Sequence, residues 1–190
     1  MAAVSASARA SSQALDVQSD DHWYSCLPLA HVGGLSVVTR SLLLGTQLTV
    51  APKFDPYETV RASHQCTLIS LVPTALQRID SRLFRTILLG GSKPPNDRPK
   101  NVIATYGMTE TGSGIVYDGR ALPGVEIKIV DDEILIRSPM NMRCYRDGSS
   151  AIDNDGWLHT GDIGSVDSNG LLQVLGRRGD VINTGSEKVW

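Results

Sequence analysis

The sequence has little cysteine, no excess of charge of one sign and no long apolar run. Its three cysteines, Cys26, Cys66 and Cys144, are widely spaced and form no CxxC pair. An odd number of isolated cysteines supports neither a disulfide framework nor a metal site. We therefore interpret them as reduced, mostly buried thiols, which predicts a cytoplasmic protein.

The other two absences narrow the range of partners. Lys and Arg number 18 against 20 Asp and Glu, a net charge of −2, so nothing indicates a nucleic-acid partner or an anionic membrane surface. A membrane-spanning helix needs roughly 20 apolar residues, and the longest apolar candidate, around residues 42–44, is far shorter. We predict no membrane span.

What is present is enough for a globular core. The chain has 190 residues, of which 41% are hydrophobic and 20% charged, as in ordinary globular proteins. Its start is rich in Ala and Ser, with one Arg and no acidic residue before Asp16. A transit peptide is one interpretation, but the single Arg and the lack of an apolar segment favour a closely packing helix of small residues.

Short apolar runs alternate with helix signals over the first 110 residues or so. Strands are expected at 23–29, 47–51, 66–72, 85–89 and 101–105, and helices at 35–44, 55–63 and 73–79. The helix at 55–63 has Asp55 as a candidate N-cap and Pro56 in its first turn. This alternation predicts βα units and a mostly parallel sheet.

The second part of the chain has a different pattern. Short alternating strands are expected at 125–130, 133–137 and 171–175. The pairs Asp155-Gly156 and Asn169-Gly170 are typical of hairpin turns, and no helical period occurs in residues 119–176. The predicted fold class is therefore α/β, with a mostly parallel sheet flanked by helices and followed by a small antiparallel β-subdomain. We divide the chain into an α/β part at 1–118, a β-subdomain at 119–175 and a final segment at 176–190.

The most informative stretch is YGMTETGSG at residues 106–114, directly after a predicted strand. Backbone N–H groups and hydroxyls can line an anion, and the Glu110 carboxylate can hold a hard cation that bridges phosphate oxygens. A tight turn with an incidental Glu is the alternative. In parallel sheets, ligands bind beyond the carboxyl ends of strands. Both this stretch and the Gly-Gly-Ser at 90–92 lie at such ends, which indicates a nucleotide site.

The order of the residues in this stretch is more specific for a protein family than their composition. YGMTET resembles the motif of the adenylate-forming superfamily, which contains acyl-CoA synthetases, luciferases and the adenylation domains of peptide synthetases. Four further segments resemble motifs of that superfamily in the same order: LPLAHVGGL at 27–35, LLGGSKPP at 88–95, GWLHTGD at 156–162 and GRRGDVINTGSEKV at 176–189. One such match would be a weak signal, whereas five in order and at similar spacing are a strong one.

The resemblance implies a role for each matching residue in nucleotide binding. Tyr106 would lie beside the adenine, Thr109 would contact the α-phosphate and Glu110 would bind Mg²⁺. Asp162 would accept hydrogen bonds from both ribose hydroxyls, and Arg177 would reach the ribose or the phosphate. Thr109 and Glu110 are the candidate catalytic residues.

Two further segments complete the implied site. The loop of Gly90, Gly91 and Ser92 would lie against the adenine, with Gly107 also in the nucleotide site, while His31 would lie beside the acyl pocket. Some of the candidates also have a purely structural interpretation: a turn aspartate for Asp162, a helix cap for Glu110, a core aromatic for Tyr106, a hydrogen-bonded loop histidine for His31 and a solvated basic pair for Arg177 and its neighbour.

The implied activity has two half-reactions. A small-molecule carboxylic acid attacks ATP with Mg²⁺ to form an acyl-adenylate and pyrophosphate, and CoA as co-substrate then displaces AMP to give a thioester. The protein positions the reactants and stabilises charge. CLPLAHVGGLSVVTRSLLLG and VYDGRALPGVEIKI further resemble bacterial acyl-CoA ligases of the o-succinylbenzoate–CoA ligase group.

The sequence also departs from the superfamily pattern. It has no Ser/Thr/Gly-rich phosphate loop ending in Lys and no C-terminal domain with the adenylation Lys, and Gly179 stands where many members have Asp or Lys as the hinge pivot. We therefore expect a ligase truncated at both ends. An incomplete half-sheet would expose apolar surface, which predicts self-association.

Two alternatives remain open. One is a nucleotide-binding module that forms no thioester. The other is another branch of the superfamily, such as a peptide-synthetase adenylation domain or a luciferase-like oxygenase.

Overall fold

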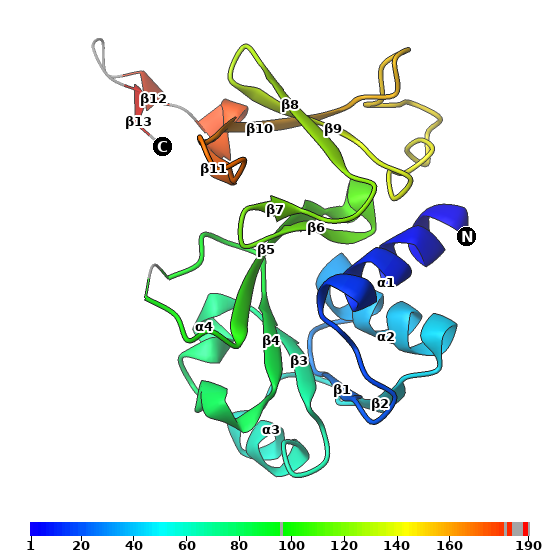
Figure 1. Cartoon of the computed structure of the whole chain (residues 1–190), viewed down its shortest axis with the longest axis vertical. Helices are drawn as coiled ribbons and strands as arrows, with labels where there is room; N and C mark the ends of the chain where they lie inside the picture. Colours follow the sequence, from blue (N-terminus) through cyan, green and yellow to red (C-terminus); the bar gives the residue numbers. More distant parts are fainter. Residues whose placement is uncertain (96, 181, 184–187, 190) are drawn as a thin grey trace.

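The computed structural model describes residues 1–95, 97–180, 182–183 and 188–189. It confirms the predicted fold class, with a mostly parallel sheet flanked by helices and a small antiparallel sheet after it (Figure 1). No helix in the described ranges is both long enough and apolar enough to cross a membrane. Within the predicted motif at 176–189, residues 181 and 184–187 lie outside the described residues.

Seven strands form the first sheet, in the order β2-β1-β3-β4-β5-β6-β7. They are β1 (His22–Ser25), β2 (Gln47–Val50), β3 (Leu68–Leu71), β4 (Thr86–Leu89), β5 (Val102–Met108), β6 (Ser113–Tyr117) and β7 (Arg120–Ala121). The strands β1 to β5 pair in parallel, whereas β6 and β7 are antiparallel to their neighbours. The carboxyl ends of five strands therefore meet at one edge of the sheet.

Four helices pack around this sheet: α1 (Ala2–Ala14), α2 (Val32–Leu44), α3 (Pro56–Ala62) and α4 (Pro73–Leu76). In Figure 1, α1 and α2 lie together on one side of the strands and α4 lies on the other. The helix predicted from the Ala/Ser-rich start is confirmed. Its small side chains let Ser7 and Ser11 hydrogen-bond at 2.5 Å to the hydroxyls of Ser113 and Tyr117 on β6.

The helix α2 begins three residues before its predicted start because Gly33 and Gly34 belong to it. A Cβ at Gly34 would lie 2.5 Å from the carbonyl oxygens of Leu27 and Pro28. Glycine thus permits the close approach of helix and loop, at some expense in helix propensity. The predicted end is confirmed, since Gly45 adopts the left-handed conformation with a φ of 72°.

Two other predicted elements have different lengths. The helix α4 is a single turn rather than the predicted 73–79. The strand β5 continues through Tyr106 and Gly107 to Met108, because β6 pairs with it antiparallel. The stretch at 106–114 that was predicted as a turn therefore begins with the end of the strand β5, and one 3₁₀ turn, η2 (Thr109–Thr111), follows.

The second sheet has four antiparallel strands in the order β11-β10-β9-β8. They are β8 (Glu126–Val130), β9 (Glu133–Arg137), β10 (Leu158–Val166) and β11 (Leu172–Arg177). The helix-free stretch predicted at 119–176 is confirmed. The nine-residue strand β10, which contains the TGD of the predicted ribose motif, was not predicted as a strand.

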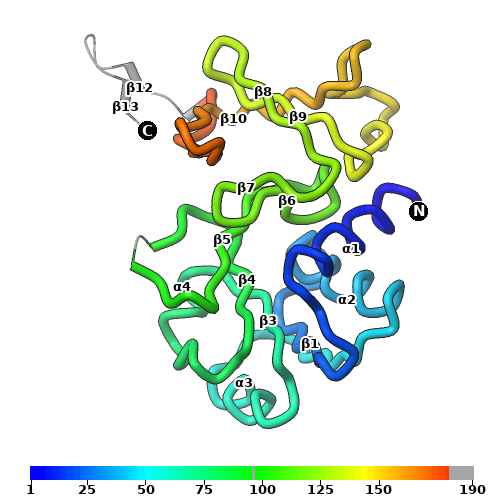
Figure 2. The backbone as a smooth tube through the Cα atoms, viewed as in Figure 1, coloured from blue at the N-terminus to red at the C-terminus, as the bar shows by residue number. Residues whose placement is uncertain are grey.

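One buried cluster joins the two sheets. It includes Trp23 of β1, Ile115 of β6, and Ile134 and Leu158 of the second sheet, all with at most 1% exposure. Figure 2 shows β6 and β7 between the parallel strands and the β8–β9 hairpin. The second sheet is therefore held against the carboxyl end of β5.

The three cysteines are free, and two of them are buried. Burial raises the pKa of the Cys26 thiol to about 12 and also raises that of Cys66. The interpretation of mostly buried thiols is confirmed.

Candidate functional site

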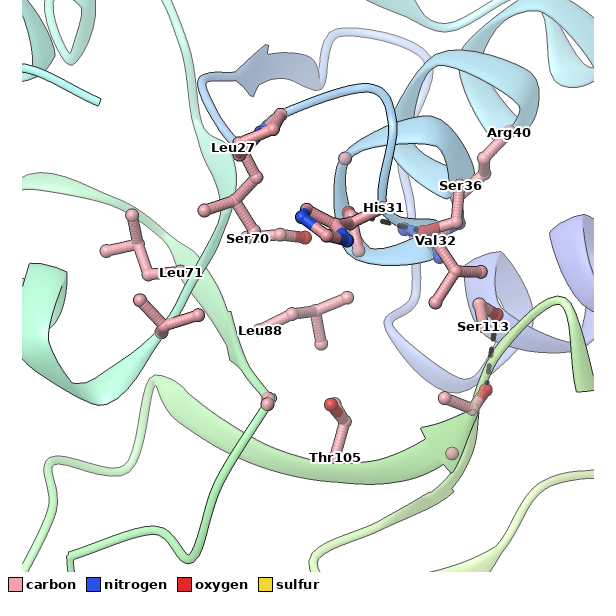
Figure 3. A pocket seen from close by; sticks show the side chains of 18 of the residues that line it. Leu27, His31, Val32, Ser36, Arg40, Ser70, Leu71, Leu88, Thr105 and Ser113 are labelled. Carbon is pink, nitrogen blue, oxygen red and sulfur yellow. Dashed lines mark hydrogen bonds between the residues drawn. The ribbon is translucent and has the colours of Figure 1, made fainter. Parts of the chain in front are cut away.

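The carboxyl ends of the parallel strands line a cavity of about 370 Å³. Its wall is mainly apolar, and Figure 3 shows Leu27, Val32 and Leu88 around a common space, with Thr105 on the opposite side from α2. His31 lies at this cavity as the N-cap residue of α2, with its side chain exposed. His31 thus lies at an apolar cavity, and its predicted place beside an acyl group stays a prediction.

One charged side chain, Arg40 of α2, lines this apolar cavity. Its exposure is only 2%, and its guanidinium stacks 4.9 Å from the ring centroid of Trp23. Among the described residues, no carboxylate pairs with it, and its Nε and Nη1 have no hydrogen-bond partner. Burial lowers the pKa of this guanidinium. A buried cation without an anion is energetically costly, so this cavity favours an anionic group.

A second cavity, of about 660 Å³, adjoins the first. Both cavities are lined by Gly91, Thr105 and Gly107, so they meet at the end of β5. Glycine is needed at position 107, because a Cβ there would lie 2.2 Å from the carbonyl oxygen of Ser113. Together, the cavities offer a mainly apolar compartment and a more polar one along the same strand.

Three predicted nucleotide-binding residues meet in the second cavity, although they are far apart in the sequence. The hydroxyl of Tyr106 donates to Oδ2 of Asp162 at 2.8 Å, and Nη1 of Arg177 lies 3.7 Å from Oδ1 of Asp162. Burial and the nearby Asp162 carboxylate raise the pKa of the Tyr106 phenol. The Tyr106 hydroxyl is therefore protonated and acts as a donor, so Asp162 is held with its carboxylate at the cavity.

The two arginines of the predicted basic pair differ in their contacts. Arg177 faces Asp162, whereas Arg178 donates to the carbonyl oxygen of Asp131 at 2.8 Å and lies 3.7 Å from Glu133. Both side chains are more than half exposed, as expected for a solvated pair, but each guanidinium has a separate acidic neighbour.

The remaining predicted residues divide into two groups. Gly90 lines the first cavity, Ser92 the second, and Gly91 and Gly107 both. Thr109 and Glu110 line neither cavity and lie in η2 just beyond β5. The structure thus brings Tyr106, Asp162 and Arg177 together, and leaves the two candidate catalytic residues beside the cavities.

Glu110 is tied to the loop after β9. Its Oε1 accepts a hydrogen bond from the Tyr145 hydroxyl at 2.9 Å, and its carbonyl oxygen accepts one from the Met142 N–H at 2.6 Å. In the described part of the chain, no group of three or more His, Cys, Asp or Glu residues is arranged to hold a metal ion. A cation at Glu110 would therefore need ligands from a substrate and from water, as Mg²⁺ commonly has.

Comparison with known proteins assigns the family. Residues 1–146 match the family model described as AMP-binding enzyme. The chain belongs to this family. It is 36% identical to the 2-succinylbenzoate–CoA ligase of Bacillus pumilus over 97% of its own length, which is 46% of that relative. This member of the AMP-binding family thus spans about half the length of the curated relatives that it matches.

Solved structures agree with this assignment. The o-succinylbenzoate coenzyme A synthetase of Bacillus subtilis, in complex with its acyl-adenylate intermediate, matches all of this chain with a TM-score of 0.90 and 30% identity. The same enzyme with ATP and a magnesium ion matches with a TM-score of 0.89. This chain covers 48% of each of those chains.

Proposed function

We propose that this chain carries the acyl-adenylate site of an ATP-dependent acid–CoA ligase. The observation that carries the proposal is the pair of adjoining cavities that meet at β5, one mainly apolar and the other with several charged side chains in its wall. An acyl-adenylate has the same division, with an acyl group and a nucleotide joined at one phosphate. Membership of the AMP-binding family and the activity named for the relatives support this function.

Arg40 supports a substrate with two carboxylates. One carboxylate becomes the acyl group at the junction of the cavities, and the other would accept hydrogen bonds from the buried guanidinium. The substrate named for the relatives, 2-succinylbenzoate, has two carboxylates on an aromatic frame. We therefore propose this acid, or one of the same class, as the substrate.

In the second cavity, we assign the nucleotide to the predicted residues. The adenine would lie against Tyr106 and the loop of Gly90, Gly91 and Ser92, and the ribose hydroxyls would bind Asp162, with Arg177 near the ribose or phosphate. Because Gly107 has no Cβ, the backbone of β6 can lie close to it beside the nucleotide. Thr109 would then contact the α-phosphate from the turn after β5.

The proposed chemistry uses ATP, Mg²⁺ and CoA. A carboxylate oxygen bonds to the α-phosphorus as pyrophosphate leaves, and the CoA sulfur then bonds to the acyl carbon as AMP leaves. Glu110 is half-buried, and one of its carboxylate oxygens accepts a hydrogen bond from Tyr145, so its other oxygen fits a magnesium ion. The ion, when bound, would neutralise phosphate charge.

Three further predictions from the sequence belong with this proposal. A cytoplasmic location and the division at 118 and 175 stay predictions, as does self-association.

A nucleotide-binding module that forms no thioester is the second candidate function, and the position of Thr109 and Glu110 outside both cavities favours it. Turnover with ATP, acid and CoA separates the two candidates.

Thermal unfolding with ligands tests the proposed site. We expect a sulfamate analogue of the 2-succinylbenzoyl-adenylate to stabilise the chain more than AMP does at the same concentration, because it occupies both cavities. A ligand at 100 times its dissociation constant adds about 2.7 kcal/mol to the free energy of unfolding. The control is Glu126→Ala, on the exposed edge of the second sheet, which should respond as the parent does. The proposal fails if neither ligand stabilises the parent.

A further inference from the structure

The strand β10 contains a bulge at the ribose residue. Its pairing with β9 joins Leu158 to Ile136 and His159 to Leu135, but then joins Ile163 to Glu133. Residues 160–162 of β10 therefore stand opposite the single residue Ile134 of β9, which leaves two extra residues on β10. Bulges of this kind re-aim side chains beside functional sites.

The backbone of the bulge is held by side chains. The N–H of Gly161 donates to Oε1 of Glu133 at 2.9 Å, and the N–H of Asp162 donates to Oγ1 of Thr160 at 3.0 Å. The Thr160 hydroxyl in turn donates to the carbonyl oxygen of Ile134 at 2.7 Å. Gly161 has a φ of 72°, a conformation that favours glycine. Glu133 thus holds the residue directly before Asp162.

Glu133 is itself oriented from its other side. Its side chain is only 13% exposed, and its Oε2 lies 3.6 Å from Nδ1 of His159 and 3.7 Å from Nη1 of Arg178. These contacts turn Oε2 toward the two basic side chains and leave Oε1 for the N–H of Gly161. Both carboxylate oxygens of Glu133 therefore face a partner within the sheet.

We propose that Glu133 is a positioning residue for nucleotide binding, which rests on the proposed role of Asp162 at the ribose. Glu133 lies outside the cavity and would act through the bulge. The bulge directs the Asp162 carboxylate to the Tyr106 hydroxyl and into the cavity. Loss of the Glu133–Gly161 bond would let Asp162 turn away, while the adenine and phosphate contacts would stay.

Titration with AMP and 2′,3′-dideoxy-AMP tests this inference, because only AMP has the hydroxyls that Asp162 would bind. Glu133→Ala should weaken AMP binding about tenfold and leave dideoxy-AMP binding unchanged. Glu133→Gln should stay within about threefold of the parent for both ligands, because its amide oxygen can still accept from Gly161. Glu126→Ala, the matched control on β8, should change neither.

Equal losses for both ligands in Glu133→Ala, or no loss for AMP, would overturn the inference. Amide hydrogen exchange without ligand gives an independent readout: the Gly161 N–H should exchange faster in Glu133→Ala, with Ile136 unchanged. If the parent does not bind AMP, the proposed function fails, and this exchange alone decides whether Glu133 holds the bulge. Unchanged exchange at Gly161 would overturn that role as well.

Discussion

Replacing Arg40 with methionine is expected to stabilise the ligand-free protein by about 1–3 kcal/mol. Arg40 is 2% exposed and has no carboxylate partner among the described residues, so the folded state bears the desolvation cost of its guanidinium. Methionine is apolar and flexible enough to fill the space. The contact with the Trp23 ring offsets part of the gain, because a cation over an aromatic face contributes about 0.5–2 kcal/mol.

Urea denaturation of the parent and the variant measures this effect. Arg61→Met is a matched control, since the Arg61 side chain is 66% exposed in α3 and its one ion pair among the described residues is with Glu58. Its change should be within about 0.5 kcal/mol. A destabilised Arg40→Met would mean that the guanidinium has a stabilising role that its contacts do not explain.

The same substitution should remove the preference for an acid with two carboxylates. The parent should bind the 2-succinylbenzoyl-adenylate analogue at least about tenfold more tightly than an analogue without the far carboxylate, because charge-assisted hydrogen bonds contribute about 1.5–3 kcal/mol. Titration of Arg40→Met should give nearly equal affinities. Arg40→Lys should lie between, because Lys keeps the charge but loses the planar fork. A preference that survives in Arg40→Met would exclude Arg40 as the carboxylate site.

Asp162→Ala is expected to weaken AMP binding at least about 100-fold, because a carboxylate that accepts two ribose hydroxyls makes two charge-assisted hydrogen bonds. Asp162→Asn keeps one acceptor oxygen and should lose about tenfold. Titration calorimetry measures both. The control is Asp20→Ala, an exposed residue before the amino end of β1, which should leave the affinity unchanged. A loss below threefold in Asp162→Ala would remove Asp162 from the ribose site.

The parallel sheet could be predicted because its strands are short apolar runs separated by clear helix and turn signals. The contact of Tyr106 with Asp162 is different, since no periodicity relates residues so far apart. Only the resemblance to a family predicted a shared site for them. The local sequence pattern therefore predicts helices and strands. Which of their side chains come together is determined by the packing of the second sheet on β5.

There are physical reasons why the sequence did not predict three features of the structure. The bulge at residues 160–162 breaks the period of two that marks a strand, so β10 was not predicted. Arg40 lies in a leucine-rich helix, where an isolated Arg ordinarily extends to solvent. The signal available in the sequence for a buried Arg was this single Arg among apolar residues, without an acidic neighbour. Glu133 follows two aspartates, and its bond to Gly161 depends on a register that the sequence does not specify.

A crystal structure of this chain with the 2-succinylbenzoyl-adenylate analogue tests the central claim most directly. We expect the acyl group in the cavity lined by Leu27 and Leu88, with its far carboxylate within about 3 Å of the Arg40 guanidinium. The ribose hydroxyls should lie on the Asp162 carboxylate. An analogue bound with its acyl group outside this cavity, or with its ribose away from Asp162, would contradict the account.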